Sequence, residues 1–489
     1  MFKLPKEGYS LMYYAKILLR CAGAFLTLCL LPCVASCDGQ TAATTAQTAA
    51  APAGGSPSAA PSAAAPQTTV FTGETVNVTT DPGAVLYTSP LTVGTTTTHA
   101  AWYNDPAADN VAAMLNRTSK ISNQAIMGWG ADDPWPDPNG PEDFSSLDSI
   151  INGHLSKLNG QLCVTFCSAP GWMKDTGNDW DMESAVKDDP ATLQAFAKLC
   201  ADIAARYPDV KYFQVWNEFK GMWNTKSNDW DYARYTRLYN AVYDAVKAVR
   251  PDAQIGGFYI VLDGDGTRPL FGNTQNDGHT GAPITSKELA GMKYWLQNMH
   301  GADFICVDRC VKDFHDDSFN VTPQQMFQLT PYFADIEQQL AAVTSLPIWW
   351  AEFYGDDDPA GQTAYGENFI GAMYASIYMN MIAGAPNSSV TALFWMEYLG
   401  NTSGGLFTDT SDASGGQPTQ HANVMENINR YFGAGARIIA SASSSGDVQV
   451  MATAETVMLI NTTDQPLQVT VNGGAGVVLE PFGVEFLGQ

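Results

Sequence analysis

Positive charge is scarce in this sequence. Its 489 residues include 25 Lys and Arg against 50 Asp and Glu, which gives a formal net charge of -25. A chain this acidic repels a phosphate backbone, so we do not expect nucleic acid as a partner. Charged residues make up only 15% of the chain, whereas 45% are hydrophobic, which is enough for a large core.

The chain also lacks an apolar run of comfortable transmembrane length. The run at residues 22–32 is too short. Basic residues precede it (Lys3, Lys6, Lys16 and Arg20), and Val34-Ala35-Ser36-Cys37 follows it. This order resembles a bacterial lipoprotein signal, cleaved before Cys37, which is then lipidated. The alternative is an ordinary signal peptide with a chance Cys. We therefore expect an exported protein anchored by lipid at the cell envelope, in the periplasm or on the cell surface.

Large apolar residues are nearly absent from residues 38–67, where Ala, Thr, Pro, Ser and Gly dominate. Such a segment cannot offset its own ordering entropy, which indicates a flexible linker behind the signal at residues 1–37. Residues 68–98 are rich in Thr and Val and predict short strands. Residues 434–489 predict further short strands, and we expect both sets to form one accessory β-sandwich.

Cysteines are few. Three of the nine leave with the signal and Cys37 is the proposed anchor; the remaining five are Cys163, Cys167, Cys200, Cys306 and Cys310. An odd number cannot pair completely. We interpret them mainly as small buried residues, although Cys306 and Cys310 could form a disulfide. Their spacing does not favour a zinc site, and we expect no metal and no cofactor.

Between residues 99 and 433, strand-like and helix-like runs alternate, which is typical of a parallel sheet with crossover helices. We count eight strands, the number that a closed barrel needs. The predicted fold is therefore an α/β (β/α)8 TIM barrel with an accessory β-sandwich domain. The eight predicted strands are residues 98–103, 125–130, 162–168, 211–217, 255–260, 303–308, 347–352 and 390–396.

Two of these strands share one form: they are apolar until a carboxylate at the carboxyl end. Trp216-Asn217-Glu218 ends the fourth, and Trp350-Ala351-Glu352 ends the seventh. Strand tips four and seven face each other across the mouth of an eight-stranded barrel, where the active sites of such barrels lie. Two carboxyls about 5–5.5 Å apart can hydrolyse a glycosidic bond with retention, one as acid and base, the other as nucleophile. Asn217 can hydrogen-bond the sugar 2-hydroxyl.

These motifs resemble those of the clan A glycoside hydrolases, which are retaining (β/α)8 enzymes. With the side β-domain, the chain looks most like glycoside hydrolase family 39, over residues 95–489. Residues 127–130, 169–174 and 215–221 are also similar to bacterial members. The resemblance implies that Glu218 is the general acid/base and Glu352 the nucleophile. It also implies an oligo- or polysaccharide substrate that contains xylose or arabinose.

Further residues at strand ends are candidates for substrate contact. His99 could touch a sugar hydroxyl, and Tyr259 could hydrogen-bond the nucleophile. Asp308 and His315 are alternatives after the sixth strand. Three tryptophans could stack on sugar rings, namely Trp129, Trp172 and Trp395. Lys174 and Lys220 could meet an acidic sugar, but a solvated rim lysine is the simpler interpretation.

Two rival functions remain at this stage. One is a surface glycan-binding lipoprotein that has the barrel but does not cleave its ligand. The other is an acidic structural lipoprotein of the envelope that neither binds nor cleaves glycans. Among enzymes, an α-L-arabinofuranosidase-type specificity competes with a β-xylosidase-type specificity, because substrate choice depends on loop shape that the sequence does not give.

Overall fold

The computed structural model describes residues 74–97, 101–127, 133–262, 284–311, 322–355, 366–396 and 405–489. Residues 73–489 belong to one compact unit. The expected signal, linker and lipidated Cys37 lie outside the described residues, as do His99, Trp129 and His315. No helix in the described ranges is long and apolar enough to cross a membrane.

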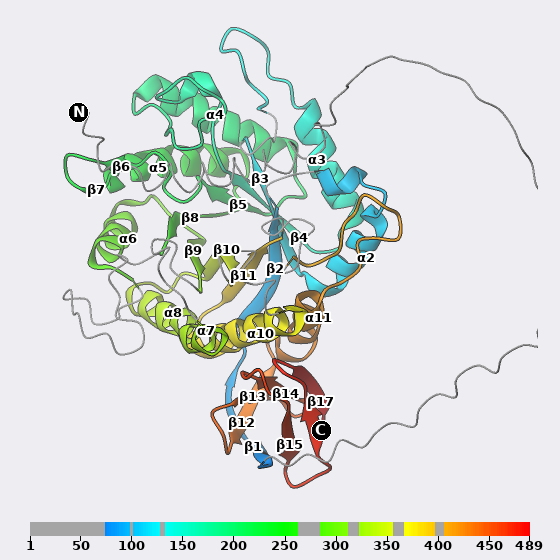
Figure 1. Ribbon diagram of the computed structural model, residues 1–489. Helices are drawn as coiled ribbons and strands as arrows, with labels where there is room; N and C mark the ends of the chain where they lie inside the picture. Colours follow the sequence, from blue (N-terminus) through cyan, green and yellow to red (C-terminus); the bar gives the residue numbers. More distant parts are fainter. Residues whose placement is uncertain are drawn as a thin grey trace, which may run out of the picture. The chain divides into compact units, whose positions relative to one another are not determined.

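Eight parallel strands close into a barrel, which confirms the predicted fold class (Figure 1). Around the barrel their order is β10-β11-β2-β3-β4-β5-β8-β9, so the last strand in sequence pairs with the first. They are β2 (Leu91–Thr97), β3 (Ile121–Ile126), β4 (Gln161–Phe166), β5 (Tyr212–Val215), β8 (Gln254–Val261), β9 (Phe304–Cys310), β10 (Ile348–Tyr354) and β11 (Val390–Trp395).

Helices follow the strands and surround the barrel in Figure 1. Two of them begin with a side-chain cap: the Asp189 carboxylate accepts from the N–H groups of Ala191 and Thr192 at the start of α4, and the Asp231 carboxylate accepts from the Arg234 N–H at the start of α5. The α-helices are α2 (Ala108–Thr118), α3 (Ser145–Lys157), α4 (Pro190–Arg206), α5 (Tyr232–Val249), α6 (Ser286–Asn298), α7 (Pro323–Leu329), α8 (Pro331–Val343), α10 (Gly366–Gly384) and α11 (Gln420–Asn427). Short turns of other helix types are η1 (Ala101–Asn104), η2 (Gly171–Met173) and η3 (Ile428–Phe432).

The accessory domain is a seven-stranded sheet in the order β16-β15-β1-β12-β13-β14-β17. Its N-terminal strand, β1 (Val76–Thr88), pairs with β12 and β15, so strands from the two ends of the folded chain lie in one sheet. The strands form one continuous sheet. Its side chains make a small apolar core that is separate from the barrel core and includes Val78, Ile439 and Leu459. The C-terminal members are β12 (Arg437–Ser443), β13 (Val448–Ala452), β14 (Thr456–Asn461), β15 (Leu467–Val471), β16 (Val477–Leu479) and β17 (Val484–Gly488).

The prediction for the first barrel strand was wrong. It placed the strand at residues 98–103 and gave everything before residue 99 to the accessory domain, whereas the strand is β2 (Leu91–Thr97) and η1 occupies residues 101–104. A Thr- and Val-rich run fits either sheet, so composition could not assign it. The packing of β2 against β3 requires a glycine at residue 94, because a Cβ there would lie 2.0 Å from the carbonyl oxygen of Ile121 on β3. The second strand also begins earlier, at Ile121.

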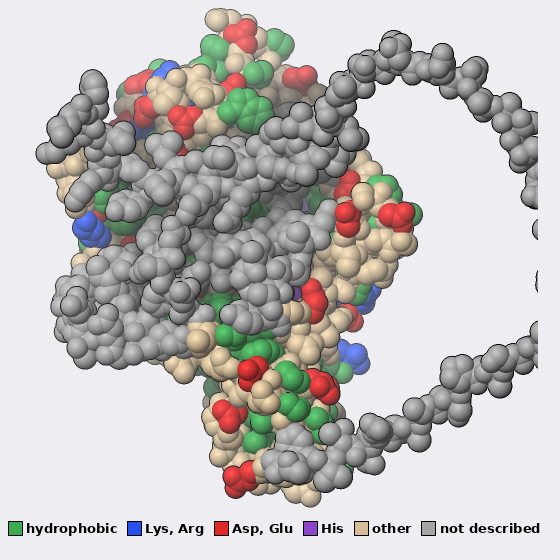
Figure 2. All heavy atoms as spheres, viewed as in Figure 1, with side chains coloured by type: hydrophobic (Ala, Val, Ile, Leu, Met, Phe, Trp, Pro, Cys, Tyr) green, Lys and Arg blue, Asp and Glu red, His purple; other side chains and the backbone are tan. Residues whose placement is uncertain are grey.

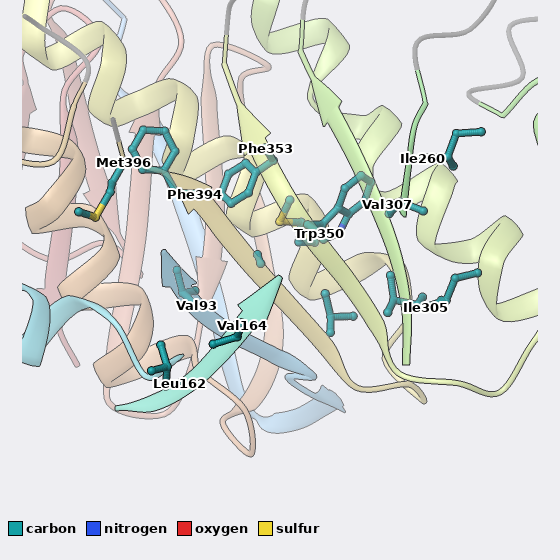
Figure 3. Packing of buried hydrophobic residues seen from close by; sticks show 14 of the residues in the cluster. Val93, Leu162, Val164, Ile260, Ile305, Val307, Trp350, Phe353, Phe394 and Met396 are labelled. Atoms are coloured by element: carbon teal, nitrogen blue, oxygen red, sulfur yellow. The ribbon is translucent and has the colours of Figure 1, made fainter. Parts of the chain in front are cut away.

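Two layers of side chains fill the barrel domain. One layer lies between strands and helices, and Figure 3 shows part of it, including Val164, Ile305 and Trp350. The other lies within the barrel and includes Tyr259, Phe304 and Trp349. The five cysteines are buried thiols, so the disulfide considered for Cys306 and Cys310 is not formed. An extended strand separates residues four apart by about 13 Å, beyond disulfide reach.

Acidic side chains are spread over the face shown in Figure 2 and do not gather into one patch on its described part.

Candidate active site

A strained turn carries Glu218 out of the barrel wall. β5 ends at Val215, and Trp216, Glu218 and Phe219 all have positive φ angles (70°, 48° and 54°), which non-glycine residues rarely adopt. Buried aromatic contacts hold this turn: Trp216 packs edge-to-face on Phe196, and Phe219 stacks on Tyr235. Backbone strain that packing maintains in this way is typical of functional sites.

A β-bulge aims Glu352. On β10, the Trp350 side chain enters the helix layer, where its indole N–H donates to Glu337 (2.9 Å), and Ala351 faces the barrel interior. Regular alternation would then turn Glu352 outward. The register on both neighbouring strands shifts immediately after Trp350, and β10 continues to Tyr354. The extra residue of a bulge re-aims a side chain, and here it lets Glu352 meet the other carboxylates.

Three carboxylates meet at the mouth of the barrel. Oxygens of Glu218, Asp308 and Glu352 all lie within 4.8 Å of one another, although the residues come from β9, β10 and the turn after β5. Asp308 and Glu352 are buried, and Glu218 is partly exposed. The predicted pairing of Glu218 with Glu352 is therefore present in the structure.

A buried lysine neutralises part of this charge. The Lys220 ammonium forms an ion pair with Glu218, whose carboxylate also accepts from the Asn217 amide at 3.2 Å. Lys220 is 5% exposed, so it is not the solvated rim residue that the sequence suggested. Burial raises the pKa of Glu352 to about 6, and the charge of Lys220 and the neighbouring Tyr259 hydroxyl limit that rise.

Tyr259 lies next to the nucleophile candidate, and its hydrogen bond to that residue stays a prediction. The residue is fully buried in the barrel, beyond a register shift of β8 that follows Gly257. Burial and the charges of Glu352 and Asp308 raise its pKa well above the usual value, so its hydroxyl stays protonated and can donate to Glu352. Asp308 was an open choice against His315, and the structure brings Asp308 to the cluster.

The two described tryptophan candidates sit differently. Trp172 is half-buried: its indole N–H donates to the Trp135 carbonyl (2.8 Å) and its ring packs edge-to-face on Trp135. Trp395 is the last residue of β11 and is also half-buried, beside Thr96 of β2. Stacking of Trp172 and Trp395 on sugar rings stays a prediction.

Lys174 supports a loop and does not line the rim. It is fully buried, and its ammonium donates to the carbonyls of Asp179 (2.8 Å) and Asp181 (3.2 Å). Burial lowers its pKa. The two carbonyls flank Trp180, which is 77% exposed.

Sequence reasoning missed a buried polar chain beneath the carboxylates. The Thr96 hydroxyl donates to the Ala351 carbonyl (2.6 Å) and accepts from the Asn123 amide (3.2 Å), while the Thr165 hydroxyl donates to Asn123 (2.8 Å). These bonds link β2, β3 and β4 to the residue before Glu352. Polar residues at positions that should be apolar in a buried strand were the available signal.

No protein-family model matches the chain, and no curated protein matches it either. Solved structures do resemble its fold. A conserved exported protein from Bacteroides fragilis is 14% identical with a TM-score of 0.54, covering 84% of this chain and 98% of that one. A monomeric beta-xylosidase from Caulobacter crescentus is 14% identical with a TM-score of 0.53, covering 82% and 84%. The catalytic domain of GH30 xylanase C from Talaromyces cellulolyticus is 14% identical with a TM-score of 0.51, covering 84% and 97%.

Proposed function

We propose that this protein is a retaining glycoside hydrolase with Glu352 as nucleophile and Glu218 as general acid/base. The observation that carries the proposal is the approach of the two carboxylates within 4.8 Å at the barrel mouth. Retention needs a separation of about 5–5.5 Å, whereas inversion needs about 6.5–9.5 Å to admit a water molecule. The short separation therefore favours double displacement.

The reaction has two balanced steps. First, a Glu352 oxygen attacks the anomeric carbon, the bond to the leaving oxygen breaks, and Glu218 gives that oxygen its proton. Then Glu218 removes a proton from water, the water oxygen attacks the anomeric carbon, and the bond to Glu352 breaks. Asn217, beside Glu218, is our candidate for hydrogen bonding the 2-hydroxyl. The wall candidates are Trp172 and Trp395, together with Trp129, His99 and His315, which lie outside the described residues.

We assign the substrate to xylose- or arabinose-containing glycans. The family resemblance in the motifs supports this class, and two structures of similar fold carry the names xylanase and beta-xylosidase. Incubation with 4-nitrophenyl β-D-xyloside and α-L-arabinofuranoside distinguishes the two specificities by nitrophenol release. Proton NMR of the first sugar formed reports retention.

The decisive control is Glu352→Ala, which should abolish release while the protein still folds by circular dichroism. Binding of arabinoxylan without turnover of any aryl glycoside would instead identify the glycan-binding alternative. Inversion of the anomeric centre would contradict the proposed roles.

We also propose that the chain is exported and anchored through lipid on Cys37. The basic and apolar segments before Val34-Ala35-Ser36-Cys37 support this. Expression in a bacterium fed radiolabelled palmitate should label the wild-type protein but not Cys37→Ser. Equal labelling, or none in either protein, would contradict the anchor.

A further inference from the structure

Lys220 lies where the proposed chemistry needs a proton. Its ammonium pairs with Glu218 and its charge also acts on Glu352. The first step requires Glu218 protonated and Glu352 ionised. A cation in contact with a carboxylate favours the ionised carboxylate, so the arrangement in the structure opposes the state that the first step needs.

The position of Lys220 is fixed by its backbone. Its carbonyl accepts from the Trp216 indole at 2.9 Å, and its N–H donates to the Asn217 carbonyl at 3.0 Å. The next residue, Gly221, has a φ of +72°, and a Cβ there would lie 2.3 Å from the Ala185 nitrogen. The turn that strains Glu218 therefore also fixes the backbone of Lys220.

The charges around Lys220 come from several strands. Within the described part of the chain, Lys220 pairs with Glu218, whose carboxylate clusters with those of Asp308 and Glu352. The charges of Glu352, Asp308 and Cys167 act on Tyr259, which lies beside Glu352. Burying a lysine ammonium costs free energy unless nearby carboxylates offset the loss of its hydration. If the ammonium moves from Glu218 towards Glu352, it still has a carboxylate partner. The ionised glutamate is then Glu352 and no longer Glu218.

We propose that Lys220 is a positioning residue that decides which of the two glutamates carries the proton. Before substrate binds, it holds Glu218 ionised. A sugar entering between the carboxylates displaces the ammonium towards Glu352, and the proton on Glu352 passes to Glu218. Glu218 then holds the proton that it later donates, and Glu352 is the anion that attacks. This inference rests on the proposed function for its purpose, but its resting arrangement can be measured without turnover.

The direct test is a carboxyl titration by NMR on protein labelled with ¹³C at the glutamate side-chain carboxyl. Signals are assigned by their loss in Glu218→Gln and Glu352→Gln. In wild type, Glu218 should ionise at lower pH than Glu352, and in Lys220→Met the gap should shrink by about one pH unit or more. Lys220→Arg should keep the order, because it keeps the charge.

The kinetic test is the pH profile of kcat/KM for a hydrolysed aryl glycoside. Removal of the cation in Lys220→Met should move the acidic limb up by about one pH unit, which is about a tenfold loss on that limb. Lys220→Arg should restore the wild-type profile, and Lys226→Met, an exposed lysine in the same loop, should leave it unchanged. A merely structural role would lower activity equally at every pH.

Failure of the two proposals looks different. If Glu218 ionises above Glu352 in wild type, or Lys220→Met moves neither titration, the inference about Lys220 is wrong even for an active glycosidase. If no glycoside is cleaved, the proposed function fails, while the wild-type titration still decides the resting ion pair. Should Lys220→Met not fold, the order of ionisation in wild type carries the test.

Discussion

Glu352 on β10 is paired in register with Asp308 on β9, immediately after the bulge that separates Glu352 from Trp350. The pairing places two carboxylates side by side in the barrel wall, with both side chains buried. Burial disfavours the ionised form that a nucleophile needs. Tyr259 and Lys220 act in the opposite direction, so the reactivity of Glu352 depends on neighbours from β8 and from the turn after β5.

Tyr259→Phe should shift the pH dependence of hydrolysis. The pKa of Glu352 is about 6 with the Tyr259 hydroxyl present, and that hydroxyl lowers it. Without it the pKa of Glu352 rises, so the limb of the kcat/KM profile that reports Glu352 should move up by about 0.5 to 1 pH unit. A profile measured on an aryl glycoside checks this. Tyr239→Phe is the control, because that buried hydroxyl bonds the Gly301 carbonyl instead; an unmoved limb in Tyr259→Phe would refute the contact's role.

Glu352→Gln should stabilise the protein above about pH 6. The native pKa of about 6 exceeds the ordinary 4.5, so the native state holds the proton more tightly than the unfolded chain. That stabilisation is complete below pH 4.5 and is lost as the pH rises through 6, a change of about 2 kcal/mol. Thermal melting at pH 4.5 and pH 8 should show a higher melting temperature for Glu352→Gln than for wild type only at pH 8.

The matched control for this experiment is Glu455→Gln, an exposed glutamate in the accessory domain. It should melt like wild type at both values. The same difference between Glu352→Gln and wild type at pH 4.5 and pH 8 would contradict the raised pKa.

Glu218→Gln should affect substrates according to their leaving group. An amide cannot donate the proton, so release of a poor leaving group such as methanol should slow by about 10²- to 10⁴-fold. 2,4-Dinitrophenol leaves without a proton, so its release in the first step should change far less. Equal losses for both substrates, measured as kcat/KM, would argue against the acid role.

His154 on α3 should make the protein sensitive to acid. Its ring is buried and bonded to the Tyr103 hydroxyl, and burial lowers its pKa from 6.5 to about 3. Below pH 6.5 the His154 ring is protonated in the unfolded chain but stays neutral in the native state, so the free energy of unfolding falls as the pH falls. The loss approaches about 4–5 kcal/mol near pH 3. His154→Gln should flatten this dependence in acid-unfolding curves, whereas exposed His300→Gln should not; parallel curves for all three proteins would exclude His154 as the cause.

The sequence by itself determined the barrel and its two glutamates. The signals were the alternation of strand-like and helix-like runs and two apolar strands that lead to Asn217-Glu218 and to Glu352. These are local patterns, and a single sequence is enough to show them. They also placed Tyr259 and Asp308 at strand ends. The expected stacking role of Trp172 and Trp395 stays a prediction.

Only the tertiary structure decided the rest. It assigned residues 91–97 to the barrel, because a threonine-rich strand fits two sheets and only the close approach at Gly94 selects one. It turned Glu352 through a bulge that appears only when β10 meets β9 and β11. It buried Lys174 beneath a loop and Lys220 among carboxylates from distant strands, because the environment of a charge depends on residues far away in the chain that the fold brings next to it.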